Sequence, residues 1–338
     1  MLRRAALAFC LALGACGIGT CFAADSRQPA KVWRIGIIAN SPPDAPEIKR
    51  IWDAFEQGLR DRGYVEGRNL VVERRYLEGK LERAPDFARE MVRLDVDLIV
   101  TAANPASVAA KAATSTIPIV MVSVADPVGA GLVANLAHPG GNVTGVASFP
   151  QDLVPKRLEL LKIALPGASR IAFVRCLKCA ALDPPAMDAA RMNGWLAAGR
   201  NLGLTMTFVD LSDPQGLDAA MEAILRARPD AVFLALNPIN GVLRNELGGS
   251  AARERLPMFA SYREQAVAGA LMAYAPSQPD MWREAATYVD KILRGAKPGD
   301  LPVEQPTTYE LVINVKAAKA LGIAIPQSLL LRADELIQ

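Results

Sequence analysis

The sequence has a single histidine, His138, and aromatic residues make up only 6% of its 338 residues. A Ser-His-Asp triad or a histidine-based metal site would therefore have to use this one residue. The chain also lacks glycine-rich phosphate-binding motifs, the GxSxG elbow of hydrolases and the HExxH motif of metalloproteases. These absences argue against the commonest hydrolase, nucleotide-binding and metalloprotease chemistries, and we expect no catalytic residue, no metal and no cofactor.

The chain also carries little net charge, and it has few long apolar stretches. The formal net charge is only +3, which is no footprint for nucleic acid, so we expect no nucleic-acid partner. Beyond the N-terminus, no stretch reaches the roughly 18 uninterrupted apolar residues of a membrane span. The N-terminus itself differs, because basic Met1–Arg4 precedes the apolar run Ala5–Ala15. This pattern is typical of an export signal, and the run is too short to cross a bilayer.

Two processing sites are compatible with this signal. The stretch Leu13–Cys16 resembles a lipoprotein box, and cleavage there would remove residues 1–15 and leave a lipidated Cys16. The small residues around Ala23 instead suit ordinary signal peptidase, which would remove residues 1–23 and leave 24–32 as a linker. Both alternatives stay open. Either one predicts an exported, periplasmic protein that touches the membrane only through a lipid on Cys16.

Two of the five cysteines, Cys176 and Cys179, form a C-x-x-C pair in the globular region. In an oxidising compartment the default prediction is a disulfide, although such pairs also serve redox and metal sites. A zinc site would need two more ligands, and His138 is the only histidine. A thioredoxin-like pair would open a helix, whereas here the next helix begins near Pro184. We therefore favour a structural disulfide.

Beta-branched runs alternate along the chain with amphipathic stretches. The first strand, 32–38, is followed by a helix with Ile51, Trp52 and Phe55 on one stripe, opened by Asp44 and Glu47 at the spacing of a capping box. A Gly- and Pro-rich stretch interrupts the alternation around 124–155, after which it resumes. Further strands are predicted at 70–77, 97–101, 117–123, 143–147, 170–175, 205–209, 231–236, 257–260, 271–274 and, as the last one, 309–313. Among the helices between them, one is predicted over 239–255. This rhythm predicts an α/β protein of two Rossmann-like lobes with parallel sheets flanked by helices.

The stretch HPGGNVTG, residues 138–145, looks at first like a phosphate cradle. We predict a short helix over 131–136 before it and a strand over 143–147 after it. A phosphate cradle has the opposite order, in which a strand leads through the loop into a helix. We therefore expect Gly140 and Gly141 to end the helix and to permit positive φ in a turn, with Asn142 supporting the turn and His138 at the surface.

Ligands of open parallel sheets bind beyond the carboxyl ends of the strands. Asn104-Pro105, after a predicted strand, suits either plain helix initiation or the binding of an anion at the helix amides. Asp126-Pro127 likewise suits either a turn or a ligand contact. The candidate ligand-binding residues at strand ends are Asn40, Ser41, Thr101, Asn104, Ser123, Asp126, Asn237 and Tyr262.

Two long motifs carry a family resemblance. The stretch SVADPVGAGLVANLAHPGGNVTGVAS (123–148) and the C-terminal stretch from YVDKILRG to ADELI (288–337) resemble the substrate-binding proteins of ABC transporters, in the tryptophan/tyrosine-binding-like (ABC_sub_bind) group. The resemblance implies a type I periplasmic-binding-protein fold with a multi-segment hinge. It places lobe 1 at 33–148 plus about 275–305, and lobe 2 at 149–274 plus about 306–338. It also adds Ser107 to the candidate cleft residues.

The resemblance further implies a function without catalysis. The protein is expected to capture a small polar molecule between its lobes, and aromatic amino acids are ligands of some relatives. It would deliver this molecule, as a monomer, to an ABC permease in the inner membrane. The alternatives are a ligand-sensing module for a receptor and an exported thiol-disulfide enzyme. The chain departs from the family at Arg175–Ala181, RCLKCAA, where the resemblance implies a Tyr-Asn-Pro-like loop.

Overall fold

The computed structural model describes residues 31–338 except 45, 149 and 181–184. Residues Val32–Gln338 form one compact unit. The predicted export signal, Cys16 and most of the predicted linker lie outside the described residues. Among the helices of the described ranges, none has both the length and the apolar character that crossing a bilayer requires.

The first sheet is parallel throughout, with strand order β2-β1-β3-β4-β5. Ile35 of β1 pairs with Val72 on one side and Leu98 on the other, which places β1 inside the sheet. Because parallel neighbours need crossover connections, helices alternate with these strands. The strands are β1 (Trp33–Ala39), β2 (Leu70–Tyr76), β3 (Leu98–Ala102), β4 (Ile119–Val124) and β5 (Val143–Ala147); the helices of this lobe are α1 (Pro46–Arg60), η1 (Leu81–Arg83), α2 (Ala84–Arg93), α3 (Ala103–Ala113), α11 (Gln278–Leu293) and η3 (Pro298–Asp300).

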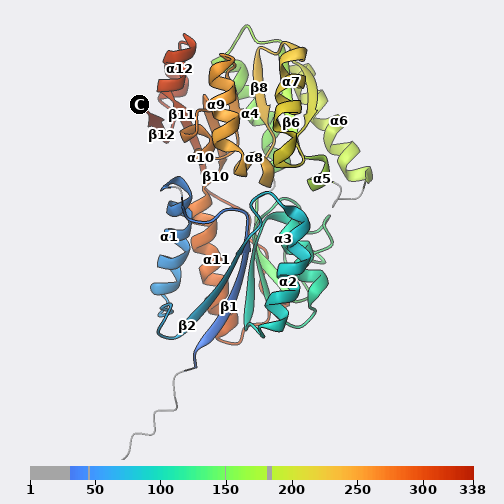
Figure 1. Ribbon diagram of the computed structural model, residues 1–338, viewed down its shortest axis with the longest axis vertical. Coiled ribbons are helices and arrows are strands. Elements are labelled where there is room, and N and C mark those ends of the chain that lie inside the picture. Colours follow the sequence, from blue (N-terminus) through green and yellow to red (C-terminus); the bar gives the residue numbers. More distant parts are fainter. Residues whose placement is uncertain (1–30, 45, 149, 181–184) are drawn as a thin grey trace, which may run out of the picture. The chain divides into compact units, whose positions relative to one another are not determined.

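Helices cover both faces of this sheet. On one face α1 packs beside α11, which arrives from far along the chain, as Figure 1 shows in blue and orange. Phe55 of α1 and Trp282 of α11 meet edge to face, with ring centroids 5.5 Å apart. The two helices lie so close that a Cβ on Gly58 would stand 2.8 Å from the Cβ of Ala286. The predicted apolar stripe of α1 is thus buried, and its partner is the late helix α11.

The second sheet has the order β12-β11-β10-β9-β8-β6-β7 and is parallel except for the β10–β11 pair. Apolar clusters fill both of its faces. Its strands are β6 (Arg170–Arg175), β7 (Thr205–Asp210), β8 (Ala231–Leu234), β9 (Met258–Ala260), β10 (Met272–Pro276), β11 (Tyr309–Asn314) and β12 (Glu335–Ile337). Its helices are α4 (Pro150–Ala164), α5 (Leu177–Ala180), α6 (Pro185–Asn201), η2 (Pro214–Gly216), α7 (Leu217–Ala227), α8 (Pro238–Val242), α9 (Arg244–Arg253), α10 (Arg263–Val267), α12 (Val315–Leu321) and α13 (Gln327–Leu330).

The prediction of two α/β lobes with sheets flanked by helices is confirmed. The chain leaves the first sheet after β5, returns where β10 leads into α11, and leaves again beyond Glu304, which bridges to Val146. Three connecting segments therefore join the two sheets. The lobe boundaries given above stay a prediction.

Three local predictions were wrong. The helix expected at 131–136 is absent, because the Asp126 carboxylate accepts from the Gly129 amide and starts a series of turns instead. The helix expected at 239–255 is two helices, α8 and α9, which meet at Leu243. The last strand is not β11, since β12 pairs with it in parallel. Each error lies where a local turn or a pairing between distant strands determines the structure, which the periodicity of apolar residues does not reveal.

The HPGGNVTG stretch is a turn that packs against a later segment. Gly140 has φ +74°, and its amide donates to the Gly299 carbonyl at 3.2 Å. The Asn142 side chain donates to the carbonyls of Ile117 and Thr114 at 2.8 and 3.1 Å, while His138 is exposed. The prediction of positive φ holds for Gly140 and not for Gly141. The strand β5 follows, so the stretch leads to the first connection between the lobes.

Candidate ligand-binding site

Two neighbouring cavities lie where strand ends of the two sheets face each other. Cavity A has a volume of about 140 Å³ and is bordered by β1, α1 and α11 of the first lobe and by α8 and α10 of the second. Cavity B has a volume of about 100 Å³ and is bordered by the start of α3, the end of β6 and α6. Both cavities are lined by Ala103, Ser123, Leu236, Asn237 and Pro238. The two cavities therefore share part of their walls at the carboxyl ends of the strands.

A larger groove, of about 1170 Å³, lies between α2, α3 and residues 212–215. Its charged lining residues have both signs, among them Lys80, Glu82, Lys178 and Asp213. It borders the ends of β2 and β7, and unlike cavity A it has no aromatic residue in its lining and none that follows β1 or β4. We therefore place the candidate ligand site in cavities A and B.

Backbone strain is concentrated at this site. Ala103 at the end of β3 has φ +63°, and Ser123 near the end of β4 has φ +58°. Non-glycine residues enter this left-handed region at a cost of roughly 1–3 kcal/mol each. Both residues line both cavities, so two residues with strained backbone conformations border the candidate site.

Aromatic rings form one wall of cavity A. The rings of Trp52 and Trp282 lie 4.9 Å apart between centroids, and Trp52 donates from its indole nitrogen to the Ser41 carbonyl. Across the cavity, the Tyr262 hydroxyl is hydrogen-bonded to the Ser123 hydroxyl at 2.7 Å. Burial raises the pKa of Tyr262, so its hydroxyl stays neutral. This wall offers flat apolar faces to a ring-bearing ligand.

Two hydrogen-bond acceptors in cavity A lack partners within the part of the chain that the structure describes. They are Oδ1 of Asn40 and Oε1 of Glu264, both buried. Glu264 is only 5% exposed, and burial raises the pKa of its carboxyl group to about 7. Leaving such groups unsatisfied costs roughly 1–3 kcal/mol each. A donor group on a ligand would satisfy them.

Ion pairs join the two lobes beside cavity A. The Arg244 guanidinium of α9 lies 3.1 Å from the Glu47 carboxylate of α1, with side-chain exposures of only 10% and 13%. Arg50 and Glu310 form a second pair at 3.2 Å. The spacing of Asp44 and Glu47 predicted a capping box, but the Glu47 carboxylate is directed to the opposite lobe. These contacts hold the two lobes together around the cavity.

The structure brings six of the nine predicted ligand residues to these cavities. Asn40, Ser41, Ser123, Asn237 and Tyr262 line cavity A, while Asn104 lines cavity B. The Asn104 side-chain oxygen accepts from the Ala125 amide at 2.8 Å, so this residue also ties β4 to the start of α3.

The other three predicted residues line neither cavity. Thr101 and Ser107 are fully buried, and their hydroxyls are hydrogen-bonded to each other at 2.8 Å. Ser107 also donates to the Ala103 carbonyl, which secures the first turn of α3. Asp126 accepts from the Gly129 amide and starts a turn. In this structure the side chains of all three residues form hydrogen bonds with nearby backbone groups or with each other.

Sequence reasoning missed several residues of the site. Trp52 was assigned to the apolar stripe of its helix, and periodicity cannot distinguish a core residue from one that also borders a cavity. Trp282 and Gln278 come from α11, which joins the first lobe through a long-range connection. Glu264 lies two residues beyond the predicted Tyr262. Glu264 is recognisable as a site residue only from its burial on a short helix after β9, which the structure shows.

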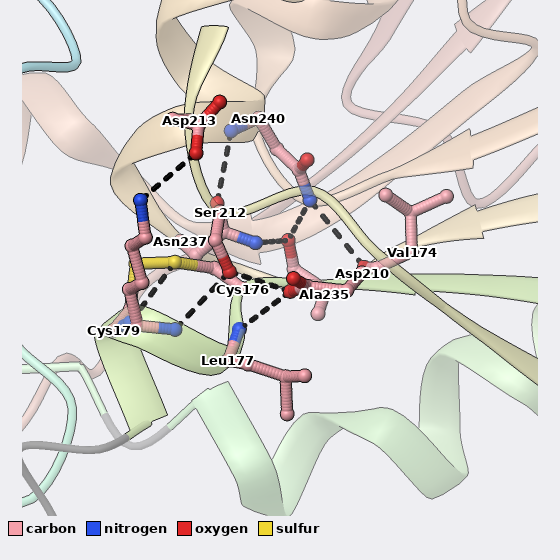
Figure 2. Close-up of a disulfide and its surroundings, with 11 residues drawn as sticks. Val174, Cys176, Leu177, Cys179, Asp210, Ser212, Asp213, Ala235, Asn237 and Asn240 are labelled. Atoms are coloured by element: carbon pink, nitrogen blue, oxygen red, sulfur yellow. Dashed lines mark hydrogen bonds and ion pairs between the residues drawn. A yellow bond between two sulfur atoms is a disulfide. The ribbon is translucent and has the colours of Figure 1, made fainter. Parts of the chain in front are cut away.

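Cys176 and Cys179 are joined by a disulfide beside cavity B (Figure 2). Cys176 directly precedes the short helix α5 and Cys179 lies within it, so the prediction that this pair does not open a helix was wrong. The first amide of α5, that of Leu177, donates to the Asp210 carboxylate at 2.8 Å. The Lys178 amide donates to the Ser212 hydroxyl at 3.1 Å. In the described ranges no cluster of His, Cys, Asp or Glu could hold a metal ion.

Two α/β lobes connected by three segments, with a cavity between their strand ends, define a two-lobed protein that binds small molecules. The family model for ABC transporter substrate binding protein matches residues 37–337, and the chain belongs to this family. The resemblance stated above is thus confirmed, including the type I periplasmic-binding-protein fold. The family is one of transport proteins and not of enzymes.

Known relatives agree with this assignment. A tyrosine-binding protein from Clostridioides difficile (strain R20291) is 26% identical over 281 residues, which cover 82% of this chain and 78% of that protein. A conserved domain protein from Vibrio cholerae O1 biovar eltor (strain N16961) has a TM-score of 0.80 and 29% identity, covering 90% of this chain and 100% of that one. An ABC domain from Streptococcus pneumoniae, solved in complex with L-Trp, has a TM-score of 0.80 and 25% identity, covering 90% and 99%.

Proposed function

We propose that this protein captures an aromatic amino acid in cavity A and delivers it to the permease of an ABC importer. The observation that carries the proposal is the pairing of an aromatic wall, Trp52 and Trp282, with two unpartnered buried acceptors, Asn40 and Glu264. Two relatives, a tyrosine-binding protein and a domain solved in complex with L-Trp, support the same ligand class.

The chemistry of the cavity matches the two ends of such a ligand. An aromatic side chain gains stacking and apolar burial against the Trp52 and Trp282 faces, worth about 0.5–1.5 kcal/mol per ring pair beyond area burial. An ammonium group donates to Asn40 Oδ1 and Glu264 Oε1, and it favours the ionised form of the Glu264 carboxylate. Such a ligand thereby satisfies the acceptors that the folded chain leaves open.

Binding would be coupled to lobe closure. The ligand contacts α1 and α11 in one lobe and α10 in the other. It therefore stabilises the closed state, in which the two lobes lie close together. The Glu47–Arg244 ion pair and the Ser123–Tyr262 hydrogen bond form across the same interface. No bond of the ligand is made or broken in this scheme. The permease would recognise the closed state.

The remaining parts of the proposal rest on the sequence. We propose a periplasmic location, export through the N-terminal signal with lipid attachment at Cys16 as one of its two processing routes, and a monomeric state. Lobe 1 would comprise 33–148 plus about 275–305, and lobe 2 would comprise 149–274 plus about 306–338.

Isothermal titration calorimetry with L-tryptophan, L-tyrosine, L-phenylalanine and L-leucine tests the ligand class. We expect the aromatic amino acids to bind at least tenfold more tightly than L-leucine, and Trp282→Leu to remove this preference. Trp33→Leu is the matched control, because Trp33 begins β1 at the opposite end of the strand from the cavity. Binding of none of the three aromatic amino acids, or equal loss in the control, would refute the proposal.

A further inference from the structure

A turn after β2 brings the first lobe against the second. A Cβ atom on Gly79 in this turn would stand only 2.8 Å from Cγ and 3.4 Å from Cδ of Pro214, which begins η2 in the second lobe. The Cδ1 atom of Ile239, on α8 of the same lobe, would lie 3.7 Å away. Real Cβ atoms essentially never come within 3.0 Å of another heavy atom, so this contact leaves room only for glycine.

The backbone of this turn is held to the end of β1. The Leu77 amide donates to the Ala39 carbonyl at 2.8 Å. The Glu78 amide donates to the Asn40 carbonyl at 2.9 Å. Glu78 and Gly79 have φ of +51° and +80°, so two successive left-handed residues fix the direction of the turn. Because Asn40 lines cavity A, the turn is hydrogen-bonded directly to a residue of the candidate ligand site.

Pro214 is supported from within the second lobe. Leu211, three residues before it, is buried in the core of that lobe. The Ser212 hydroxyl accepts from the Lys178 amide at 3.1 Å, beside the Cys176–Cys179 disulfide (Figure 2). The ring of a proline is closed onto its own backbone and cannot swing aside like the end of a long side chain. A clash with Pro214 would therefore be relieved by moving the two lobes apart.

An apolar side chain extends the same contact. Leu81 of η1 packs against a buried core cluster of the first lobe and also against one of the second lobe. The turn therefore meets the second lobe through Gly79 and Leu81 together. Close-packed surfaces of this kind have one preferred separation, because protein interiors pack without space to spare.

We propose that Gly79, Leu81 and Pro214 form a closure stop, the contact that sets how near the two lobes come when a ligand is bound. The proposal goes beyond the proposed function and takes from it only the ligand used as a probe. All three residues line the large groove, and none of them lines cavity A. The closure stop acts on affinity through the closed state, because a variant that holds the lobes apart lowers the population of that state.

Gly79→Ala tests the closure stop, and Gly67→Ala is the matched control. Gly67 precedes β2, has φ +79°, and has no heavy atom beyond its chain neighbours within 4 Å of the position of a Cβ. The two variants therefore carry the same left-handed alanine, and only Gly79→Ala meets Pro214. In calorimetry, Gly79→Ala should bind L-tyrosine about 5- to 150-fold more weakly than the wild type, the usual range for coupling between two sites. Gly67→Ala should stay within about twofold of the wild type.

Removing the opposing ring tests whether the clash causes the loss. Pro214→Ala deletes Cγ and Cδ, the two ring atoms that a Cβ on residue 79 would meet. The double variant Gly79→Ala/Pro214→Ala should therefore bind L-tyrosine at least about fivefold more tightly than Gly79→Ala alone. A loss that came only from strain in the turn would not be relieved in this way. Thermal melting confirms that each variant is folded.

Small-angle scattering with and without L-tyrosine measures the separation of the lobes. The radius of gyration of Gly79→Ala should exceed that of the wild type and of Gly67→Ala in at least one of the two conditions. Equal radii in both conditions, or an affinity loss that Pro214→Ala does not relieve, overturns the closure stop and leaves aromatic binding in cavity A intact. Failure of the wild type to bind L-tyrosine, L-tryptophan and L-phenylalanine overturns the proposed function, and the scattering comparison then decides the closure stop by itself.

Discussion

Ligand affinity should depend on pH through Glu264. Its carboxyl group is 5% exposed in cavity A, and burial raises its pKa to about 7; Arg50 and Arg263 lower the pKa slightly, and Glu310 raises it. An ammonium ligand binds the ionised carboxylate, so ligand-free protein must lose a proton on binding below pH 7. For one such group, affinity should fall about 100-fold from pH 8 to pH 5.

The same group should affect folding in the opposite direction. Because the pKa in the folded state lies above the ordinary value of 4.5, the folded chain holds the proton more tightly than the unfolded chain. The contribution of Glu264 to stability is therefore fully present below about pH 4.5 and is lost as pH rises through 7. The loss is on the order of 3 kcal/mol. Glu264→Gln, which stays neutral, should raise the free energy of unfolding of the ligand-free protein at pH 8.

Calorimetry from pH 5 to pH 8, in buffers of different ionisation enthalpy, measures both the affinity and the proton released. Glu264→Gln should bind L-tyrosine more weakly at pH 8 and show a flatter pH profile. Glu246→Gln, at an exposed position on α9, is the control. An affinity of the wild type that stays constant from pH 5 to pH 8, without proton release, would refute the reasoning.

Two further predictions concern contacts around the cavities. Glu47→Gln leaves the buried Arg244 guanidinium without a counter-charge, and breaking a fully buried ion pair in this way costs about 3–5 kcal/mol. L-tyrosine affinity should therefore fall at least tenfold, and small-angle scattering should show a more open protein. Unchanged affinity would contradict this role. Reduction of the Cys176–Cys179 disulfide should lower the free energy of unfolding by about 2 kcal/mol, whereas a double serine variant should melt identically with and without dithiothreitol. Catalytic reduction of a disulfide substrate by the protein would instead favour the thiol-disulfide enzyme.

Local patterns were sufficient for most of the elements and for the fold class. Strand-length apolar runs and the stripe on α1 reflect side-chain periods of two and 3.6 residues, which depend on neighbours in sequence. Alternation of strands with helices then predicts parallel sheets, and strand ends pointed to Asn40, Ser123, Asn237 and Tyr262. These four residues line cavity A because parallel sheets place every carboxyl end at one edge, and their role in ligand binding stays a prediction.

The composition of the site was decided by tertiary structure. Trp282 reaches the first lobe only because the chain crosses back between the sheets before α11, and Glu47 finds Arg244 rather than a cap because the two lobes meet there. Thr101 and Ser107, equally plausible in sequence, satisfy each other instead. The sequence by itself determined most of the elements and the fold class, because these depend on short-range periodicity, and it carried the family motifs. Only the tertiary structure decided which polar groups are buried without partners, because that depends on contacts between residues far apart in the chain.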